Sequence, residues 1–289
     1  MPVRRVLDAI GSFATWNRYP KPLRAADGRA FGATTVVVMK TRLRIATYNI
    51  HMARGLDRRV NPARIVRVLE EIDADVVALQ EVLSFEGRSR EENQALFIAE
   101  NLAWNYCAGE TKRLNGGSYG NVILSRWPID GERRHDLSVS PLDRRGCLRA
   151  DIRLHRGRLL HVFNVHLSTA FLERRGQARK LVAPEVLNSQ GLRGPRVVLG
   201  DFNEWTRGLV SRLLAGQFES VDIRKHLRRS RTYPGILPIF HLDHIYFDPL
   251  LVLERLTLHK SRTALVASDH LPLVAEFRLL GQRPHPMHP

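Results

Sequence analysis

Side chains that can bind a metal ion or move a proton stand at the ends of short apolar segments. They occur in the runs Thr47-Tyr48-Asn49-Ile50-His51, Leu79-Gln80-Glu81, Asn164-Val165-His166, Gly200-Asp201-Phe202-Asn203, Leu242-Asp243-His244 and Ser268-Asp269-His270. Burial in an apolar core would not explain these residue types. If the segments are strands that end at one edge of a sheet, their polar ends meet in one cleft.

Such a cleft would gather carboxylates, amides and imidazoles. Its members would be Glu81, Asp201, Asp243, Asp269, Asn49, Asn203, His166 and His270. Carboxylates that face one another repel unless a cation or a proton compensates their charge. Oxygen ligands without sulfur favour Mg2+, with Mn2+ as a substitute, over Zn2+. Because Mg2+ polarises a phosphoryl oxygen while His and Asn donate hydrogen bonds to it, the set predicts metal-assisted hydrolysis of a phosphate ester.

Short strands alternating with helices must position these residues. We expect strands at residues 43–49, 76–80, 121–125, 147–154, 159–166, 196–200, 242–247 and 273–277, and helices at 62–72, 91–102, 171–187 and 207–215. The first helix has Asn61 as its cap and Pro62 in its first turn, where the missing N–H has no partner to lose. This alternation predicts packed α/β layers.

Composition indicates a globular protein with a strongly positive field. The chain has 289 residues, 44% of them hydrophobic, and 45 Lys and Arg against 29 Asp and Glu give a formal charge of +16. Polyanions are therefore favoured partners, and nucleic acid, anionic lipid headgroups and small phosphate esters all fit. The same charge could serve solubility alone.

Cysteine content and hydropathy point to the cytoplasm. Cys107 and Cys147 are too few for a disulfide framework and too far apart for a Cys-X-X-Cys metal site. The longest aliphatic stretch near the start, Val36-Val37-Val38-Met39, is far shorter than the roughly 20 residues that span a bilayer. The residues around Asp8 lack the continuous apolar core of an export signal. We therefore expect a cytoplasmic protein.

We expect three parts along the chain. Residues 1–40 form a basic extension, either disordered, or an artefact of a start site that belongs at Met39, or an arm that touches a membrane or nucleic acid. Residues 41–280 form one catalytic domain, because no linker divides them. Residues 281–289 form a disordered tail.

Taken in order, the motifs resemble the endonuclease/exonuclease/phosphatase family, which includes deoxyribonuclease I, exonuclease III, sphingomyelinases and inositol polyphosphate 5-phosphatases. The resemblance rests on Tyr48-Asn49, Leu79-Gln80-Glu81, Gly120-Asn121-Val122-Ile123-Leu124-Ser125-Arg126, Asn164-Val165-His166-Leu167, Gly200-Asp201-Phe202-Asn203, Leu242-Asp243-His244-Ile245 and Ser268-Asp269-His270-Leu271-Pro272. Each motif is weak alone, but the ordered set is specific. It implies a four-layer α/β sandwich, in which two mixed β-sheets pack face to face with helices on both outer faces.

The resemblance also implies roles for the metal ligands and the water-activating pair. Glu81 would be the main metal ligand, with Asn49 and Asp269 close to the ion and able to bind it directly or through water. Asp201 and Asn203 would position or deprotonate the attacking water and hold the phosphoryl group.

Two histidines complete the implied catalytic set. His270 would donate to the phosphate or transfer a proton, and Asp243 would fix its tautomer through the second ring nitrogen. The base could be Asp201 or His270. His166 matches a position that contacts the phosphate in deoxyribonuclease-like members.

Three residues are candidates for substrate binding. Asn121 would support the cleft through its side-chain amide. Arg149 is either a second phosphate contact or a solvated strand arginine. His51 follows the site asparagine and is either a member of the site or a neighbour of it.

We therefore predict a Mg2+-dependent phosphodiester hydrolase with nucleic acid as its favoured substrate. Arginine pairs at 133–134, 144–145, 174–175 and 228–229 could follow a phosphate backbone. A lipid or small-molecule phosphodiesterase of the sphingomyelinase type is the alternative, with an anionic membrane surface as partner, although the segment between Asn203 and Asp243 leaves little room for a membrane-dipping hairpin. A second alternative is an inactive phosphate- or nucleic-acid-binding module, against which the intact set argues. No obligate protein partner is evident.

Overall fold

The computed structural model describes residues 42–189, 191–205, 208–220, 232–234 and 240–280. The chain divides into two units, Met1–Met39 and Lys40–Pro289, and all described residues belong to the second. The expected basic extension and the expected tail at 281–289 lie outside the described residues. So does the arginine pair at 228–229.

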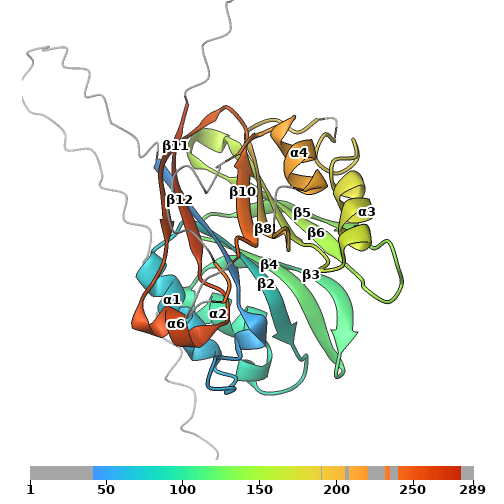
Figure 1. The fold of residues 1–289 in the computed structure, drawn as a ribbon. Coiled ribbons are helices and arrows are strands. Elements are labelled where there is room, and N and C mark those ends of the chain that lie inside the picture. The colour runs from blue at the N-terminus through green and yellow to red at the C-terminus, as the bar shows by residue number, and fades with distance from the viewer. Residues whose placement is uncertain (1–41, 190, 206–207, 221–231, 235–239, 281–289) are drawn as a thin grey trace, which may run out of the picture. The chain divides into compact units, whose positions relative to one another are not determined.

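Two six-stranded mixed sheets form the centre of the second unit (Figure 1). In spatial order, the first sheet contains β11 (Leu251–Leu258), β12 (Leu273–Leu279), β1 (Arg42–Asn49), β2 (Val76–Ser84), β4 (Gly117–Ser125) and β3 (Asn105–Leu114). The second contains β5 (Ile129–Asp136), β6 (Gly146–Arg153), β7 (Leu159–His166), β8 (Arg196–Asp201), β10 (Asp243–Phe247) and β9 (Glu219–Ser220). The β1–β2 and β7–β8 pairs are parallel, and the other strand pairs are antiparallel.

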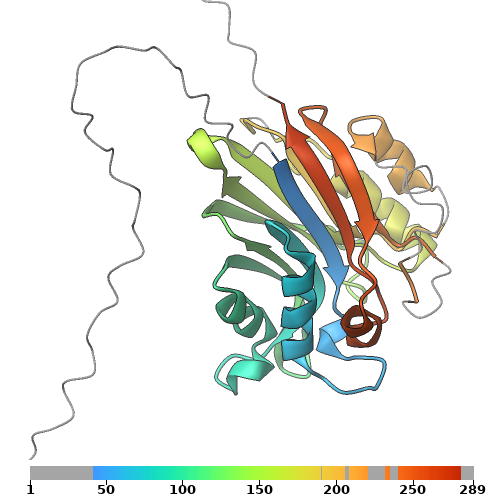
Figure 2. The same cartoon turned by 90° about the vertical axis from the view of Figure 1, so that its left-hand side faces the viewer.

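Helices cover the outer faces of both sheets (Figures 1 and 2). The first sheet carries α1 (Pro62–Ile72), α2 (Gln94–Leu102) and α6 (Arg262–Ala267), and the second carries α3 (Phe171–Leu181) and α4 (Leu209–Ala215). Short 3-10 helices occur at His51–Ala53, Arg90–Glu92 and His155–Gly157. The predicted four-layer α/β sandwich is confirmed. In the described residues, no helix is long and apolar enough to cross a membrane.

Local chemistry explains where the helices begin and end. The Asn61 side chain accepts a hydrogen bond from the Arg64 N–H, so α1 starts at Pro62 as predicted. The predicted helix at 91–102 is instead a 3-10 turn followed by α2, because Asn93 caps a new helix at the Leu96 N–H. The predicted helix at 171–187 ends at Leu181, shortly before Pro184, whose ring disfavours helical geometry in the preceding residue.

The inner faces of the central strands change from apolar to polar toward one end of the sandwich. Alternate residues along a strand share a face. Leu43 and Ile45 belong to the core between the sheets, so Thr47 and Asn49 continue the same face. The same progression runs through Leu160, Val162, Asn164 and His166, through Val197, Leu199 and Asp201, and through Phe247, Ile245 and Asp243. The inter-sheet core therefore ends in a layer of amides and then in a layer of ionisable groups.

Candidate active site

Strand register brings three predicted site residues of the second sheet into one row. In the parallel β7–β8 pair, His166 is opposite Asp201. In the antiparallel β8–β10 pair, Asp201 is opposite Asp243, the first residue of its strand. All three side chains are buried. The sheet itself therefore places an imidazole and two carboxylates side by side.

Asn49 connects this row to the first sheet. Its Nδ2 atom donates hydrogen bonds to Glu81 Oε1 at 2.9 Å and to Asp201 Oδ2 at 3.0 Å. His166 Nε2 lies 3.9 Å from Glu81 Oε1 and 3.8 Å from Asp201 Oδ2. Two carboxylates that are 120 residues apart in sequence thus share one amide donor.

Glu81 reaches this point because strand β2 is irregular there. Alternation would place Glu81 on the face opposite its buried neighbour Gln80, toward the helices. The pairing of β2 with β4 shifts between Leu79 and Val82, and Glu81 adopts a left-handed backbone conformation with φ of 57°. Such a bulge redirects a side chain. The Glu81 carboxylate consequently faces Asn49 and remains 20% exposed.

The loop before β12 supplies Asp269 and His270. Ser268 Oγ donates to the carbonyl oxygen of Asn49 at 2.8 Å and thereby ties this loop to the end of β1. His270 Nδ1 lies 3.0 Å from Asp243 Oδ2, and its Nε2 lies 3.7 Å from Asp201 Oδ2. The contact with Asp243 orients the ring, so that Nε2 faces the shared carboxylate cluster.

The carboxylates control the charge of the imidazoles. Burial alone would lower the pKa of His270, but the charges of Asp243, Asp201 and Asp269 and the hydrogen bond to Asp243 raise it to about 10. Burial, with the charge of Asp243, raises the pKa of Asp201 to about 7, although His270 opposes this shift. At neutral pH, His270 is therefore a cation beside a carboxylate of raised basicity.

His166 has the opposite electrostatic character. Burial lowers its pKa well below the ordinary value, and the positive charges of Arg145, His270 and Lys112 lower it further. The imidazole is therefore neutral at neutral pH and keeps one nitrogen that can accept and one that can donate a hydrogen bond.

His51 and Asn203 lie at the edge of the cluster, and both have positive φ angles. The His51 N–H donates to Asn49 Oδ1 at 3.0 Å, and its Nδ1 lies 3.4 Å from Asp269 Oδ1. The Asn203 N–H donates to Asp201 Oδ1 at 2.9 Å, while its Nδ2 donates to the carbonyl oxygen of Leu167. Both residues thus hold the ligand and base candidates in place.

Arg149 does not join the cluster. It shares a strand face with Cys147, which packs in the outer core against the helices. Its side chain is buried there, with Nη2 2.9 Å from Asp151 Oδ2, and Asp151 in turn contacts His161 Nδ1. Strand alternation therefore directs Arg149 away from the side of the sheet that carries Asp201, which disfavours the predicted phosphate contact.

Asn121 links the two sheets beneath the cluster. Its Nδ2 donates to the carbonyl oxygens of Gly146 and Asn164, both in the second sheet. Asn164 in turn donates to the carbonyl oxygens of Leu79 and Val122 in the first sheet. These buried amides join the two sheets directly under the ionisable layer.

Three further residues lie around the cluster, and sequence reasoning assigned no role to two of them, Gln80 and Tyr119. Gln80, in the motif beside Glu81, donates to Asn164 Oδ1 at 2.8 Å and extends the amide layer. Tyr119 faces the cluster, and its pKa is raised by burial and by the charge of Glu81. The Tyr233 ring centre lies 4.9 Å from that of His270. Alternation from Asn121 could have identified Tyr119. Tyr233 belongs to the sequence 231–234, which resembles a family segment that closes one side of the cleft, and its position beside His270 agrees with that resemblance.

The donor chemistry at this point fits a hard divalent cation. Glu81 and Asp201 converge on Asn49, and the buried Asp243 adds a further negative charge nearby. Both cysteines are buried in apolar cores away from these oxygens. In the part of the chain that the structure describes, no three or more His, Cys, Asp and Glu side chains are arranged to enclose a metal by themselves. Mg2+ fits such a set, because it keeps several waters and needs one or two carboxylates plus substrate oxygens.

Comparison with known proteins finds relatives along most of the chain. A model described as the Endonuclease/Exonuclease/phosphatase family matches residues 46–270. The uncharacterized protein YbhP of Escherichia coli K12 is 29% identical over 246 residues, which are 82% of this chain and 96% of that protein. The crystal structure of endonuclease/exonuclease/phosphatase from Beutenbergia cavernae has 25% identity and a TM-score of 0.65, covering 83% of this chain and 72% of that one. Mannosyl-6-phosphatase Bt3783 of Bacteroides thetaiotaomicron has 19% identity and a TM-score of 0.65, with coverage of 81% and 99%.

Proposed function

Because the chain belongs to the endonuclease/exonuclease/phosphatase family, we propose that it hydrolyses phosphodiester bonds with the help of Mg2+ and that its substrate is nucleic acid. The observation that carries this proposal is the shared contact of Glu81 and Asp201 with Asn49, beside the Asp243–His270 pair. A phosphoryl group bound there would meet an anionic metal site on one side and a cationic imidazole on the other.

Glu81 would hold the metal, with Asn49 and Asp269 close by and water completing its shell. When bound, Mg2+ would polarise the phosphoryl oxygen and stabilise the leaving oxyanion. Mn2+ offers the same preference for oxygen ligands and should substitute for it. The exposed part of the Glu81 side chain gives such an ion access from solvent.

Side chains of the cluster would remove the proton of the attacking water and hold the phosphoryl group. Asp201 accepts a proton from the attacking water. Its Oδ2 atom lies near His166 Nε2 and His270 Nε2, and a water between these two nitrogens would be oriented toward that oxygen. His270 donates a hydrogen bond to the phosphoryl oxygen, and Asp243 keeps its ring in position. Asn203 holds the second oxygen of Asp201 and so directs the first one toward the water.

Charge supports nucleic acid as the substrate class. The chain carries a formal charge of +16, and the arginine pair at 144–145 is near enough for Arg145 to lower the pKa of His166 through its charge. A polyphosphate strand would gain favourable contacts along such a surface. One structural neighbour is named as a mannosyl-6-phosphatase, an enzyme that acts on a phosphate monoester. A phosphate monoester is therefore the substrate class to compare with nucleic acid.

One observation favours a lipid phosphodiester as the second candidate. Phe171, Leu172 and Trp205 are 56%, 78% and 53% exposed. They lie shortly after His166 and Asn203 in sequence, and Arg174 and Arg175 accompany them. Exposed apolar residues beside basic ones suit an anionic membrane surface.

Nicking of supercoiled plasmid tests the proposal. We expect the purified protein to nick the plasmid in Mg2+, to lose this activity in EDTA, and to lose it in Asp201→Ala. Asp130→Ala is the matched control, because Asp130 forms a surface ion pair with Arg153 away from the cluster. A folded protein that leaves DNA and RNA intact but hydrolyses anionic phospholipid vesicles would reject nucleic acid in favour of the lipid candidate.

A further inference from the structure

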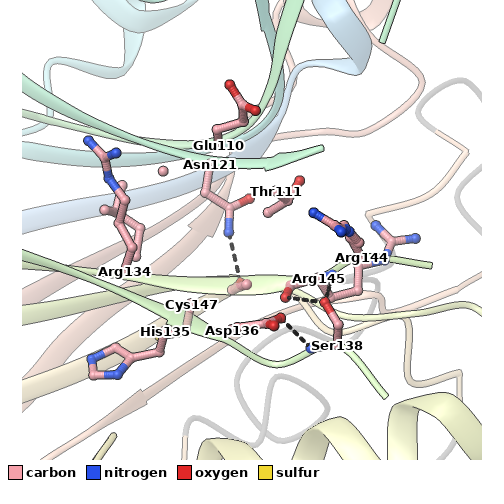
Figure 3. A pocket seen from close by; sticks show the side chains of 13 residues that line it. Glu110, Thr111, Asn121, Arg134, His135, Asp136, Ser138, Arg144, Arg145 and Cys147 are labelled. Atoms are coloured by element: carbon pink, nitrogen blue, oxygen red, sulfur yellow. Dashed lines mark hydrogen bonds between the residues drawn. The ribbon is translucent and has the colours of Figure 1, made fainter. Parts of the chain in front are cut away.

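A hollow is lined by strands of both sheets and by the loop between β5 and β6 (Figure 3). We call it the arginine pocket and define it by Arg134, Arg144, Arg145, Thr111, Ser138 and Asn121, which line it together with neighbouring backbone. Its volume is about 220 Å³. The walls come from β3, β4, β5, β6 and the loop between β5 and β6, so both sheets contribute to it.

Positive charge dominates the wall of the arginine pocket. Three arginines face two carboxylates, Glu110 and Asp136, which leaves one net positive charge. Glu110 is already paired with Arg113 at 3.2 Å, and Asp136 accepts a hydrogen bond from the Ser138 N–H. Glu110 is thus paired with an arginine outside the pocket, whereas Asp136 is near enough to Arg144 for that positive charge to help lower the Asp136 pKa.

The arginines differ in how much of their charge is free. Arg134 Nη2 lies 2.9 Å from Glu132 Oε1, and Arg145 Nε lies 2.9 Å from Asp143 Oδ1. Among the residues that the structure describes, no carboxylate lies within 4.0 Å of the Arg144 guanidinium. Arg144 is exposed and therefore able to turn toward an incoming anion. In Figure 3, Arg134 lies on one side of Asn121, and Arg144 and Arg145 lie on the other.

The arginine pocket adjoins the catalytic cluster. Asn121 lines it and donates to the carbonyl oxygen of Asn164, which stands two residues before His166 on β7. Cys147, another lining residue, pairs with Val165, the residue next to His166. Arg145 is also close enough to His166 for its charge to lower the pKa of that imidazole.

We propose that the arginine pocket binds a second phosphate group of the substrate, the one next to the scissile phosphate on a nucleic-acid strand. A planar guanidinium presents paired donors to phosphate oxygens, and Thr111 and Ser138 add hydroxyl donors on the same wall. This inference rests on the proposed function, and it goes further because it makes a neighbouring phosphate a determinant of specificity.

Dinucleotides with and without a terminal phosphate test the inference. The dinucleoside monophosphate dTpdT carries the scissile phosphate alone, whereas pdTpdT and dTpdTp each add one phosphate. We expect kcat/KM in Mg2+ to be at least tenfold higher for one of the two phosphorylated dinucleotides than for dTpdT. In Arg144→Gln this ratio should fall to threefold or less, and Arg134→Gln should lower it as well.

Arg255→Gln is the matched control, because Arg255 is an exposed strand arginine on β11 that does not line the arginine pocket. Its ratio should equal that of the wild type. Hydrolysis of all three dinucleotides at the same rate would overturn the second phosphate site and leave the proposed function standing. A preference that survives in both Arg144→Gln and Arg134→Gln would overturn the assignment to this pocket. No hydrolysis of these dinucleotides, plasmid or bis(p-nitrophenyl) phosphate in Mg2+ or Mn2+ would overturn the proposed function and this inference together.

Discussion

Asp243 illustrates how one buried carboxylate can set the charge of a neighbouring imidazole. Its Oδ2 atom lies 3.0 Å from His270 Nδ1, while its Oδ1 atom is buried and has no hydrogen-bond partner among the described residues. A buried carboxylate with a free oxygen is costly unless a charge compensates it. Protonated His270 provides that compensation.

We predict that Asp243→Asn lowers the pKa of His270 from its wild-type value of about 10. The substitution removes the largest raising influence and leaves the burial that opposes it. Imidazole NMR of the metal-free protein across pH 5 to 11 measures the change. His135 on strand β5, whose pKa is lowered by burial, is the internal control, and its pKa should be the same in the variant and the wild type. An unchanged His270 titration would mean that Asp201 and Asp269 alone hold its charge.

The contrast between Asp201 and Glu81 shows how far single residues could be inferred from sequence. Asp201 follows Val197 and Leu199 at intervals of two, so alternation correctly assigns it to the inner face. The same rule assigns Glu81 to the outer face, and only the motif resemblance identified it as a site residue. The bulge that turns Glu81 inward has no signature in the residues around it, because it arises from the pairing with β4.

At the scale of elements, the strands that the sequence did not predict all lie at the edges of the sheets. The structure adds β3, β5, β9 and β11 to the eight predicted strands, and these four are the edges of the two sheets. Edge strands carry polar and charged side chains that discourage pairing with other chains. The segment 129–136, for example, has the sequence Ile-Asp-Gly-Glu-Arg-Arg-His-Asp. Central strands are apolar enough to be recognised, whereas edge strands are identified through their neighbours.

Gly200 is the element-scale feature on which the site depends most directly. It precedes Asp201, has a φ of 144°, and leaves no room for a Cβ atom, which would lie 1.9 Å from the carbonyl oxygen of Val165. A side chain here would push β8 away from β7 in the row that joins His166 to Asp201. The position thus requires glycine for both its conformation and its close approach to the neighbouring strand.

We predict that Gly200→Ala lowers the free energy of unfolding by about 2 kcal/mol or more, since backbone strain of this kind costs about 1–3 kcal/mol before any clash is counted. The melting temperature should fall by roughly 4–8 °C. Gly216→Ala is the control, because Gly216 has a φ of −77° and a Cβ atom there meets nothing closer than 3.5 Å. Differential scanning calorimetry of both variants gives the comparison, and equal melting temperatures would contradict the argument.

At the scale of the molecule, the formal charge of +16 predicts binding of a polyanion. If arginines of the chain contact the phosphates of a nucleic-acid strand, each contact releases counterions. We expect the Kd for single-stranded DNA to rise about tenfold or more when NaCl increases from 50 to 200 mM, which corresponds to roughly two to three phosphate contacts. Fluorescence anisotropy with a labelled oligonucleotide in Ca2+ measures this. A Kd that is insensitive to salt would argue against backbone contacts.

Burial of the neutral His244 ring makes the stability of the domain sensitive to acid. Burial lowers the pKa of His244 more than the charges of Glu204 and Asp243 raise it, and its Nε2 atom has no hydrogen-bond partner in the described residues. The unfolded chain therefore binds a proton below about pH 6.5 that the folded chain does not. Stability contributed by this site is complete above that pH and is lost as the pH falls.

We predict that His244→Phe reduces this acid sensitivity. The ring lies among aromatic neighbours, with its centre 5.6 Å from that of Phe202, so a phenyl group suits the position. Between pH 7.5 and 5.5 the wild type should lose up to about 1.4 kcal/mol more than the variant. Urea denaturation at both pH values measures the difference, and parallel losses in the two proteins would show that His244 is not the group that titrates.

The amide layer has a consequence for the time course of isotope exchange. Both Nδ2 hydrogen-bond acceptors of Asn164, the carbonyl oxygens of Leu79 and Val122, belong to the opposite sheet, and the side chain is fully buried. Solvent deuterons can reach this amide group once the two sheets separate, an event close to complete unfolding of the domain. The side-chain NH2 signal of Asn164 should thus persist in heavy water as long as the slowest backbone amides and act as a clock for the opening of the sandwich beneath the catalytic cluster.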